Sequence, residues 1–185
     1  DANHCDFDDD HYEYLASDFS DYRLELVESL INNINLDNGG TVIVYNKSFE
    51  QSRLNEFITL FPQYQKQLQK IIDHLFDLLY IVSNNKSLYQ KLGFDLEDAT
   101  KINYYHNDLE GSYSIKKVLP LFSDLSYDNL DIGNGVDAIT SYASFKDLLP
   151  EDLEIVRSNL RKYCKQDTWA MYVILQGLKK KVGII

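Results

Sequence analysis

The chain has 185 residues and a formal net charge of −11; 44% of its residues are hydrophobic and 25% are charged. This hydrophobic content excludes a disordered chain, and the length fits one domain or part of a larger one. The acidic balance argues against a protein that coats nucleic acid through a basic surface. It is compatible with a nuclease, because the metal ligands of such enzymes are carboxylates.

Cysteine usage and hydropathy indicate where the protein works. Two cysteines are too few for a disulfide framework or a four-thiolate zinc site, which favours a reducing compartment. The best apolar run, residues 75–82, is far shorter than the roughly 20 residues of a membrane span. No signal peptide is visible in the sequence. We therefore expect a cytoplasmic protein without a membrane partner.

The first third of the chain predicts a helix, a strand and a second helix. Residues 1–11 are expected to form a polar lead-in, and residues 12–185 to belong to a single domain. Apolar residues at helical spacing predict a helix over 12–36, which ends at a glycine-containing turn. The β-branched run 41–45 predicts a buried strand. A capping box, Ser48-Phe-Glu-Gln51, then starts the second helix.

The remainder of the chain predicts mainly helices. The second helix ends at Phe61-Pro62, and a third covers about residues 63–82. The polar segment 83–111 is predicted to be a long loop, followed by short helices over 112–122 and 134–143. Pro150 fits the first turn of a long final helix, whose end carries three lysines.

The predicted class is α/β and rich in helices, but the one predicted strand cannot form a sheet by itself. The chain also lacks an initiator Met, which indicates a processed chain or a piece of a longer one. We expect the first strands of the sheet to lie before residue 1. The edge of strand 41–45 should then be exposed, or covered by a second copy of the chain in a homodimer.

Two acidic residues are expected to face the core rather than the solvent. Glu50 follows the predicted strand and lies on the same helical face as Leu54 and Phe61. Asp167 lies on the apolar stripe of the final helix, one turn after Tyr163. Because a buried carboxylate without a partner is costly, the two acids are expected to converge on a cation or a substrate. The alternative is that each is a structural carboxylate that caps a helix or pairs with an arginine.

The motifs around these acids resemble those of a known enzyme superfamily. Asn46-x-x-Phe-Glu50 after an apolar strand, and Tyr163-x-x-x-Asp167 on a downstream helix, resemble the second and third motifs of the DEDD-type (DnaQ-like) 3′–5′ exonucleases. Residues 111–120, Gly-Ser-Tyr-Ser-Ile-Lys-Lys-Val-Leu-Pro, and the sequence Tyr-Cys-x-x-Asp-Thr at 163–168 are similar to an uncharacterised bacterial branch of that superfamily. The similarity covers about residues 12–180.

This resemblance implies a ribonuclease H-like fold and hydrolysis of phosphodiester bonds in single-stranded DNA or RNA from the 3′ end. It also implies that Glu50 and Asp167 bind divalent metal, usually a pair of magnesium or manganese ions, and that Tyr163 orients the attacking water. Glu50 stands where the superfamily more often has Asp. Four further residues are candidates for substrate binding: Asn46, Phe49, Asp77 and Lys116.

Some of these candidates have simpler interpretations. The predicted helical face of Asp77 is mixed, so a solvated acid is the simpler interpretation of that residue. Lys116 belongs to a pair of lysines, and a solvated position on the surface is the simpler interpretation of that residue as well. Cys164 is most simply a small buried hydrophobe.

One motif of the superfamily has no counterpart in the chain. The first motif, Asp-x-Glu on the first strand, would supply two of the four acids, and Asp6-Phe-Asp8 lacks a flanking apolar strand. We therefore expect the chain to be the C-terminal part of such a domain and to be inactive by itself. The second hypothesis is an acidic helical module that binds a protein partner without catalysis.

Overall fold

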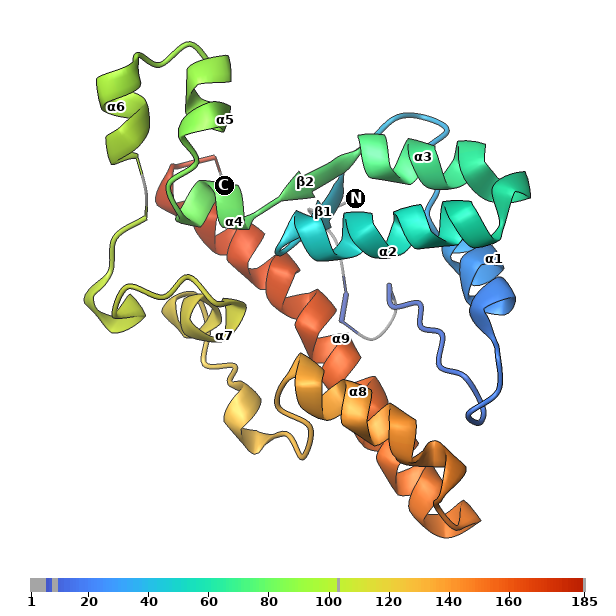
Figure 1. Cartoon of the computed structure of the whole chain (residues 1–185). Helices are drawn as coiled ribbons and strands as arrows, with labels where there is room; N and C mark the ends of the chain where they lie inside the picture. Colours follow the sequence, from blue (N-terminus) through green and yellow to red (C-terminus); the bar gives the residue numbers. More distant parts are fainter. Residues whose placement is uncertain (1–5, 8–9, 103, 185) are drawn as a thin grey trace.

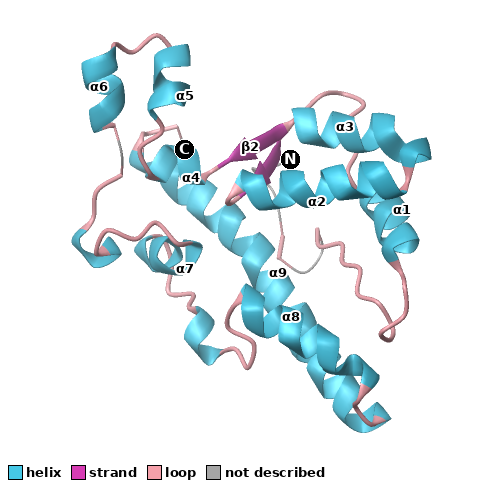
Figure 2. Ribbon diagram, viewed as in Figure 1, coloured by secondary structure: helices cyan, strands magenta, loops and turns pink. Residues whose placement is uncertain are grey.

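The computed structural model describes residues 6–7, 10–102 and 104–184, and it shows an α/β chain dominated by helices (Figure 1, Figure 2). One long helix runs through the molecule, with the small sheet and the first helices on one side of it (Figure 1). The elements in chain order are α1 (Arg23–Asn33), β1 (Val42–Val44), α2 (Lys47–Leu60), α3 (Gln65–Asp73), β2 (Leu75–Asp77), α4 (Leu79–Val82), α5 (Lys86–Lys91), α6 (Leu96–Lys101), α7 (Ile115–Val118), α8 (Gly135–Ala143) and α9 (Pro150–Lys181).

The sheet consists of two short parallel strands. Val42 of β1 lies opposite Leu75 of β2, and Val44 lies opposite Asp77. The backbones of Val42 and Val44 bond to the β2 side. Because alternate residues of a parallel strand direct their N–H and C=O groups to opposite sides, those of Ile43 point away from β2. No third strand pairs with β1 within residues 6–7, 10–102 and 104–184.

The second strand corrects the prediction of one continuous helix over 63–82. α3 ends at Asp73, β2 occupies the next few residues, and α4 begins only at Leu79. The run 75–82 is almost entirely apolar, and in a run this short periodicity does not distinguish a buried strand from a helix. The predicted lone strand therefore has a partner inside the chain, and the carboxyl ends of both strands meet at one edge.

Two further boundaries differ from the prediction. The first helix begins at Arg23, and residues 12–22 form no regular element. The predicted loop 83–111 contains α5 and α6, whose first turns are capped by the side chains of Asn85 and Asp95. Such short polar helices carry a weak periodicity signal, so their caps are the clearest sequence sign of them. The predicted lead-in over residues 1–11 and the sequence Asp6-Phe-Asp8 lie partly outside the described residues.

Other predicted boundaries are confirmed. α2 ends before Phe61-Pro62, as expected from the missing N–H of proline. The Asn134 side chain accepts a hydrogen bond from the backbone N–H of Asp137 and caps α8. α9 begins at Pro150, and its last turn carries the three lysines at 179–181.

The sheet lies between two apolar clusters. One cluster joins β1 and β2 to α1, α2 and α3, and its largest fully buried members are Val27 and Leu68. The other joins α4 and α7 to α9, and Ile43 and Tyr45 of the β1 segment pack against it. The carboxyl end of β1 therefore lies where these clusters meet, beside the middle of α9.

Within the described ranges, no helix is long and apolar enough to cross a bilayer.

Candidate active site

Asp77 ends β2 and holds the start of two helices. Its side chain is 2% exposed and accepts hydrogen bonds from the backbone N–H groups of Asn46 (3.0 Å), Lys47 (2.8 Å) and Leu79 (2.9 Å). These N–H groups have no helical partners and form the positive end of each helix dipole, so a carboxylate stabilises them. Asp77 is therefore a buried structural cap, and the prediction of a solvated acid is wrong. The predicted capping role of Ser48 is wrong, since α2 begins at Lys47, before Ser48. Asp77 caps the first turn of this helix instead.

Glu50 turns toward the core from the first turn of α2. Its Oε2 atom is buried and has no hydrogen-bond partner in the described part of the chain. Burial raises the pKa of Glu50 above its ordinary value, and the charges of Asp77 and Asp167 raise it further. Glu50 therefore lies within electrostatic reach of Asp167, although the two residues belong to distant parts of the sequence.

Asp167 is half-buried in the middle of α9. Its Oδ1 atom accepts a hydrogen bond of 2.8 Å from the hydroxyl of Tyr127. Burial raises the pKa of Asp167, and this effect outweighs the lowering caused by the Tyr127 hydrogen bond and the Lys116 charge. Burial and the neighbouring Asp167 charge also raise the pKa of Tyr127, which keeps that hydroxyl a neutral donor.

A cavity of about 600 Å³ lies beside Asp167, at the carboxyl end of β1. The Tyr45 hydroxyl donates to the Tyr113 carbonyl oxygen over 2.5 Å and so closes one wall. Tyr163 lies one helical turn before Asp167, and burial raises the pKa of Tyr163 to about 12, so its hydroxyl is protonated at neutral pH. The lining residues are Tyr45, Asn46, Leu79, Ser83, Tyr113, Ser114, Ile115, Tyr163 and Asp167.

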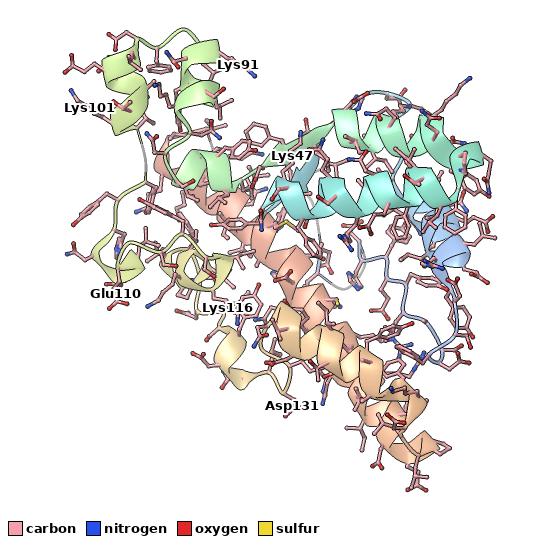
Figure 3. The ribbon with its side chains drawn as sticks, in the orientation of Figure 1. Lys47, Lys91, Lys101, Glu110, Lys116 and Asp131 are labelled. Carbon is pink, nitrogen blue, oxygen red and sulfur yellow. The ribbon has the colours of Figure 1, made fainter. Side chains whose placement is uncertain are left out.

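The predicted substrate-binding residues separate into two groups. Asn46 lines the cavity in a left-handed conformation (φ 75°). Asp77, Phe49 and Lys116 are not among the cavity-lining residues. Lys116 belongs to α7 (Figure 3), and its Nζ lies 5.8 Å from the centre of the Tyr127 ring. Phe49 is 57% exposed and lies beside Arg53 instead, because its position on α2 faces away from the buried side.

Sequence reasoning missed Tyr127, the hydrogen-bond partner of Asp167, and several polar residues of the cavity wall, and it misplaced one neighbour. Tyr127 follows a loop without any motif, and its proximity to Asp167 arises from the path of the chain between α7 and α8. Cys164 is exposed, so the prediction of a buried hydrophobe is wrong. The stripe of α9 instead buries Leu160, Ala170 and Ile174.

The carboxylates of Glu50 and Asp167 are the type of ligand that a hard divalent cation prefers. Glu50 offers the unpartnered Oε2 atom, and Asp167 offers the oxygen that Tyr127 does not bond; magnesium and manganese prefer such oxygen ligands. Both oxygens of Asp77 are already occupied by backbone N–H groups. Among the residues that the structure describes, no group of three His, Cys, Asp or Glu side chains could hold a metal ion. Glu50 and Asp167 are therefore donors of a suitable kind, and a cation site here would need further donors besides these two.

The geometry defines a class of protein: an α/β domain with a carboxylate-flanked cavity at the carboxyl ends of parallel strands. Residues 2–114 match the family described as a domain of unknown function, DUF2779, and the chain belongs to this family. No solved structure matches the chain.

Three curated mycoplasmal proteins are similar to the chain. It is 30% identical over 175 residues to the uncharacterized protein UU173 of Ureaplasma parvum serovar 3, which covers 85% of the chain and 23% of that protein. It is 34% identical over 144 residues to the MG366 homolog of Mycoplasma pneumoniae (71% of the chain, 19% of that protein). It is 29% identical over 187 aligned residues to MG366 of Mycoplasma genitalium (92% and 25%). The chain thus spans a quarter or less of the length of these relatives.

Proposed function

We propose that this chain is the C-terminal part of a metal-dependent nuclease domain of the DEDD-type (DnaQ-like), ribonuclease H-like class. In the intact protein the domain hydrolyses phosphodiester bonds of single-stranded DNA or RNA from the 3′ end. One observation carries the proposal: the buried, unpartnered oxygen of Glu50 lies within electrostatic reach of Asp167, and Asp167 lines a cavity at the strand ends. In α/β sheets, ligands bind at this end of the strands.

The unpaired side of β1 supports the proposal that strands are missing. The backbone groups of Ile43 point away from β2, and no described strand pairs with them. Exposed strand edges are normally paired or covered, so an additional strand fits here. The relatives are about four times longer than the chain, which leaves ample sequence for such strands. A second copy of the chain at this edge is the other proposed cover.

The chemistry assigned to this chain rests on three side chains. A divalent cation, when bound, activates a water and stabilises the leaving oxygen. Glu50 and Asp167 would hold it through their oxygens, and the remaining ligands would come from outside the described residues. Tyr163, protonated at neutral pH, would orient the attacking water from the cavity wall. Lys116 carries a positive charge close to Asp167, where it would meet a substrate phosphate.

The test uses the full-length protein and the Asp167→Asn variant. We expect wild type to shorten 5′-labelled single-stranded oligonucleotides in the presence of manganese. The variant should lose activity by a factor on the order of 100 or more, because even outer-shell partners of a metal contribute 10–100-fold. Asp152→Asn, an exposed acid on the same helix, is the matched control and should keep full activity. Full activity of Asp167→Asn, with its circular dichroism unchanged, would remove Asp167 from the mechanism.

A second function, an acidic module that binds a protein partner without catalysis, is favoured by one observation. The net charge of the chain is −11. Calorimetric titration of the full-length protein with manganese separates the two functions. Binding that Asp167→Asn abolishes supports the nuclease, and no binding at millimolar manganese supports the interaction module.

A further inference from the structure

Tyr127 connects the loop before α8 to the acid on α9. It begins a short 3-10 turn, Tyr127–Asn129, and is 5% exposed. Its hydroxyl donates to Oδ1 of Asp167 over 2.8 Å. A tyrosine hydroxyl has one proton to donate, so this bond commits it to Asp167 and leaves the second carboxylate oxygen without a bond from Tyr127.

A second hydrogen bond joins the same two segments. The Gln166 side chain donates from Nε2 to the backbone carbonyl oxygen of Ser126 over 3.0 Å. Adjacent residues of the loop are therefore bonded to adjacent residues of the helix, which restricts both the distance and the rotation between the segments. The Tyr127 ring is held as well, with the Tyr163 ring centre at 6.2 Å and Lys116 Nζ at 5.8 Å.

We propose that Tyr127 is a positioning residue, whose hydroxyl holds the Asp167 carboxylate in the orientation that a bound cation requires. The inference rests on the proposed function, because the orientation of Asp167 matters only if the carboxylate is a ligand. Hydrogen bonds to ligating carboxylates typically change metal affinity by about 10–100-fold. Tyr127 does not line the cavity, so it acts through Asp167 rather than on substrate.

The experiment measures manganese affinity of the full-length protein by electron paramagnetic resonance at one fixed pH. Tyr127→Phe keeps the buried ring and removes the hydroxyl. We expect affinity to fall about 10-fold, kcat to fall with it, and KM for an oligonucleotide to stay unchanged. The matched control is Tyr64→Phe, which removes a tyrosine–carboxylate hydrogen bond, to Glu28, far from the cavity. It should bind manganese as wild type does.

A further variant tests the same connection through the neighbouring hydrogen bond. Gln166→Ala breaks the companion bond without altering the tyrosine and should weaken affinity in the same direction by a smaller factor. This variant decides the question if Tyr127→Phe does not fold.

The outcomes separate the two claims. Unchanged affinity in Tyr127→Phe, or an equal loss in Tyr64→Phe, overturns the positioning role while the nuclease proposal stands. Unchanged affinity in Gln166→Ala has the same consequence when Tyr127→Phe is unfolded. No manganese binding by wild type overturns the proposed function, and the positioning role with it.

Discussion

The carboxylate at the start of α2 and those near the cavity edge beside α9 differ in how completely their oxygens are hydrogen-bonded. At the start of α2, Asp77 is almost fully buried and both its oxygens accept backbone N–H bonds. At the cavity edge, Asp167 receives a bond from Tyr127, whereas Oε2 of Glu50, within electrostatic reach of Asp167, receives none from any described residue. In the first region, both carboxylate oxygens have hydrogen-bond partners, so the residue is structural. The second region keeps a buried carboxylate oxygen without a hydrogen-bond partner, and binding functions concentrate at such sites.

The largest expected effect on stability comes from Asp77→Asn. The change is nearly isosteric, but it places an amide donor against backbone N–H donors that the carboxylate now satisfies. Hydrogen bonds to charged groups contribute about 1.5–3 kcal/mol, so we expect unfolding free energy to fall by about 3 kcal/mol and Tm by about 10 °C. Differential scanning calorimetry measures both. A loss below about 0.5 kcal/mol would mean that Asp77 is not a structural cap.

Glu50→Gln should have a smaller effect of opposite sign. Folding raises the pKa of Glu50 through burial and the charges of Asp77 and Asp167, so ionisation costs more in the folded state than in the unfolded state. This cost is absent below about pH 4, where the unfolded side chain is protonated, and it develops as pH rises toward the raised folded pKa. The variant should match wild type below pH 4 and be more stable by about 1 kcal/mol at pH 7.

Urea unfolding of Glu50→Gln at both pH values gives this comparison. Glu56→Gln on the same helix is the control, since Glu56 is exposed and forms a surface pair with Arg53. It should give no stabilisation at either pH. Destabilisation of Glu50→Gln at pH 7 would show that Glu50 is a structural residue.

The smallest expected effect on stability belongs to Asp167→Asn. Asparagine keeps an oxygen that accepts from Tyr127, and the charge that it removes costs the folded state only a little stability, because Tyr127 and Lys116 partly offset the burial of Asp167. We expect unfolding free energy at pH 7 to change by less than about 0.5 kcal/mol in the same urea measurement. A loss comparable to that of Asp77→Asn would show that Asp167, like Asp77, is a structural residue. The contrast between the two regions would then disappear.

Local signals were sufficient for several elements. The missing N–H of proline ended α2 and started α9, and the Asn134 cap marked the start of α8. Helical spacing also predicted that Glu50 and Asp167 lie on the apolar faces of their helices. The face on which a side chain lies depends only on the residues within two turns of it. The roles of Glu50, Tyr163 and Asp167 stay predictions, and the variants above examine those of Glu50 and Asp167.

Tertiary packing decided the rest. The apolar run 75–82 is equally compatible with a helix and a strand. The strand β2 forms because β1 lies parallel to it and pairs with it. The burial of Asp77 follows from that pairing, which brings its carboxylate to unbonded N–H groups of a helix distant in sequence. Tyr127 reaches Asp167 through the course of an irregular loop. Spacing along the chain determines which way a residue faces, whereas the identity of its neighbours depends on contacts between segments that the local pattern does not encode.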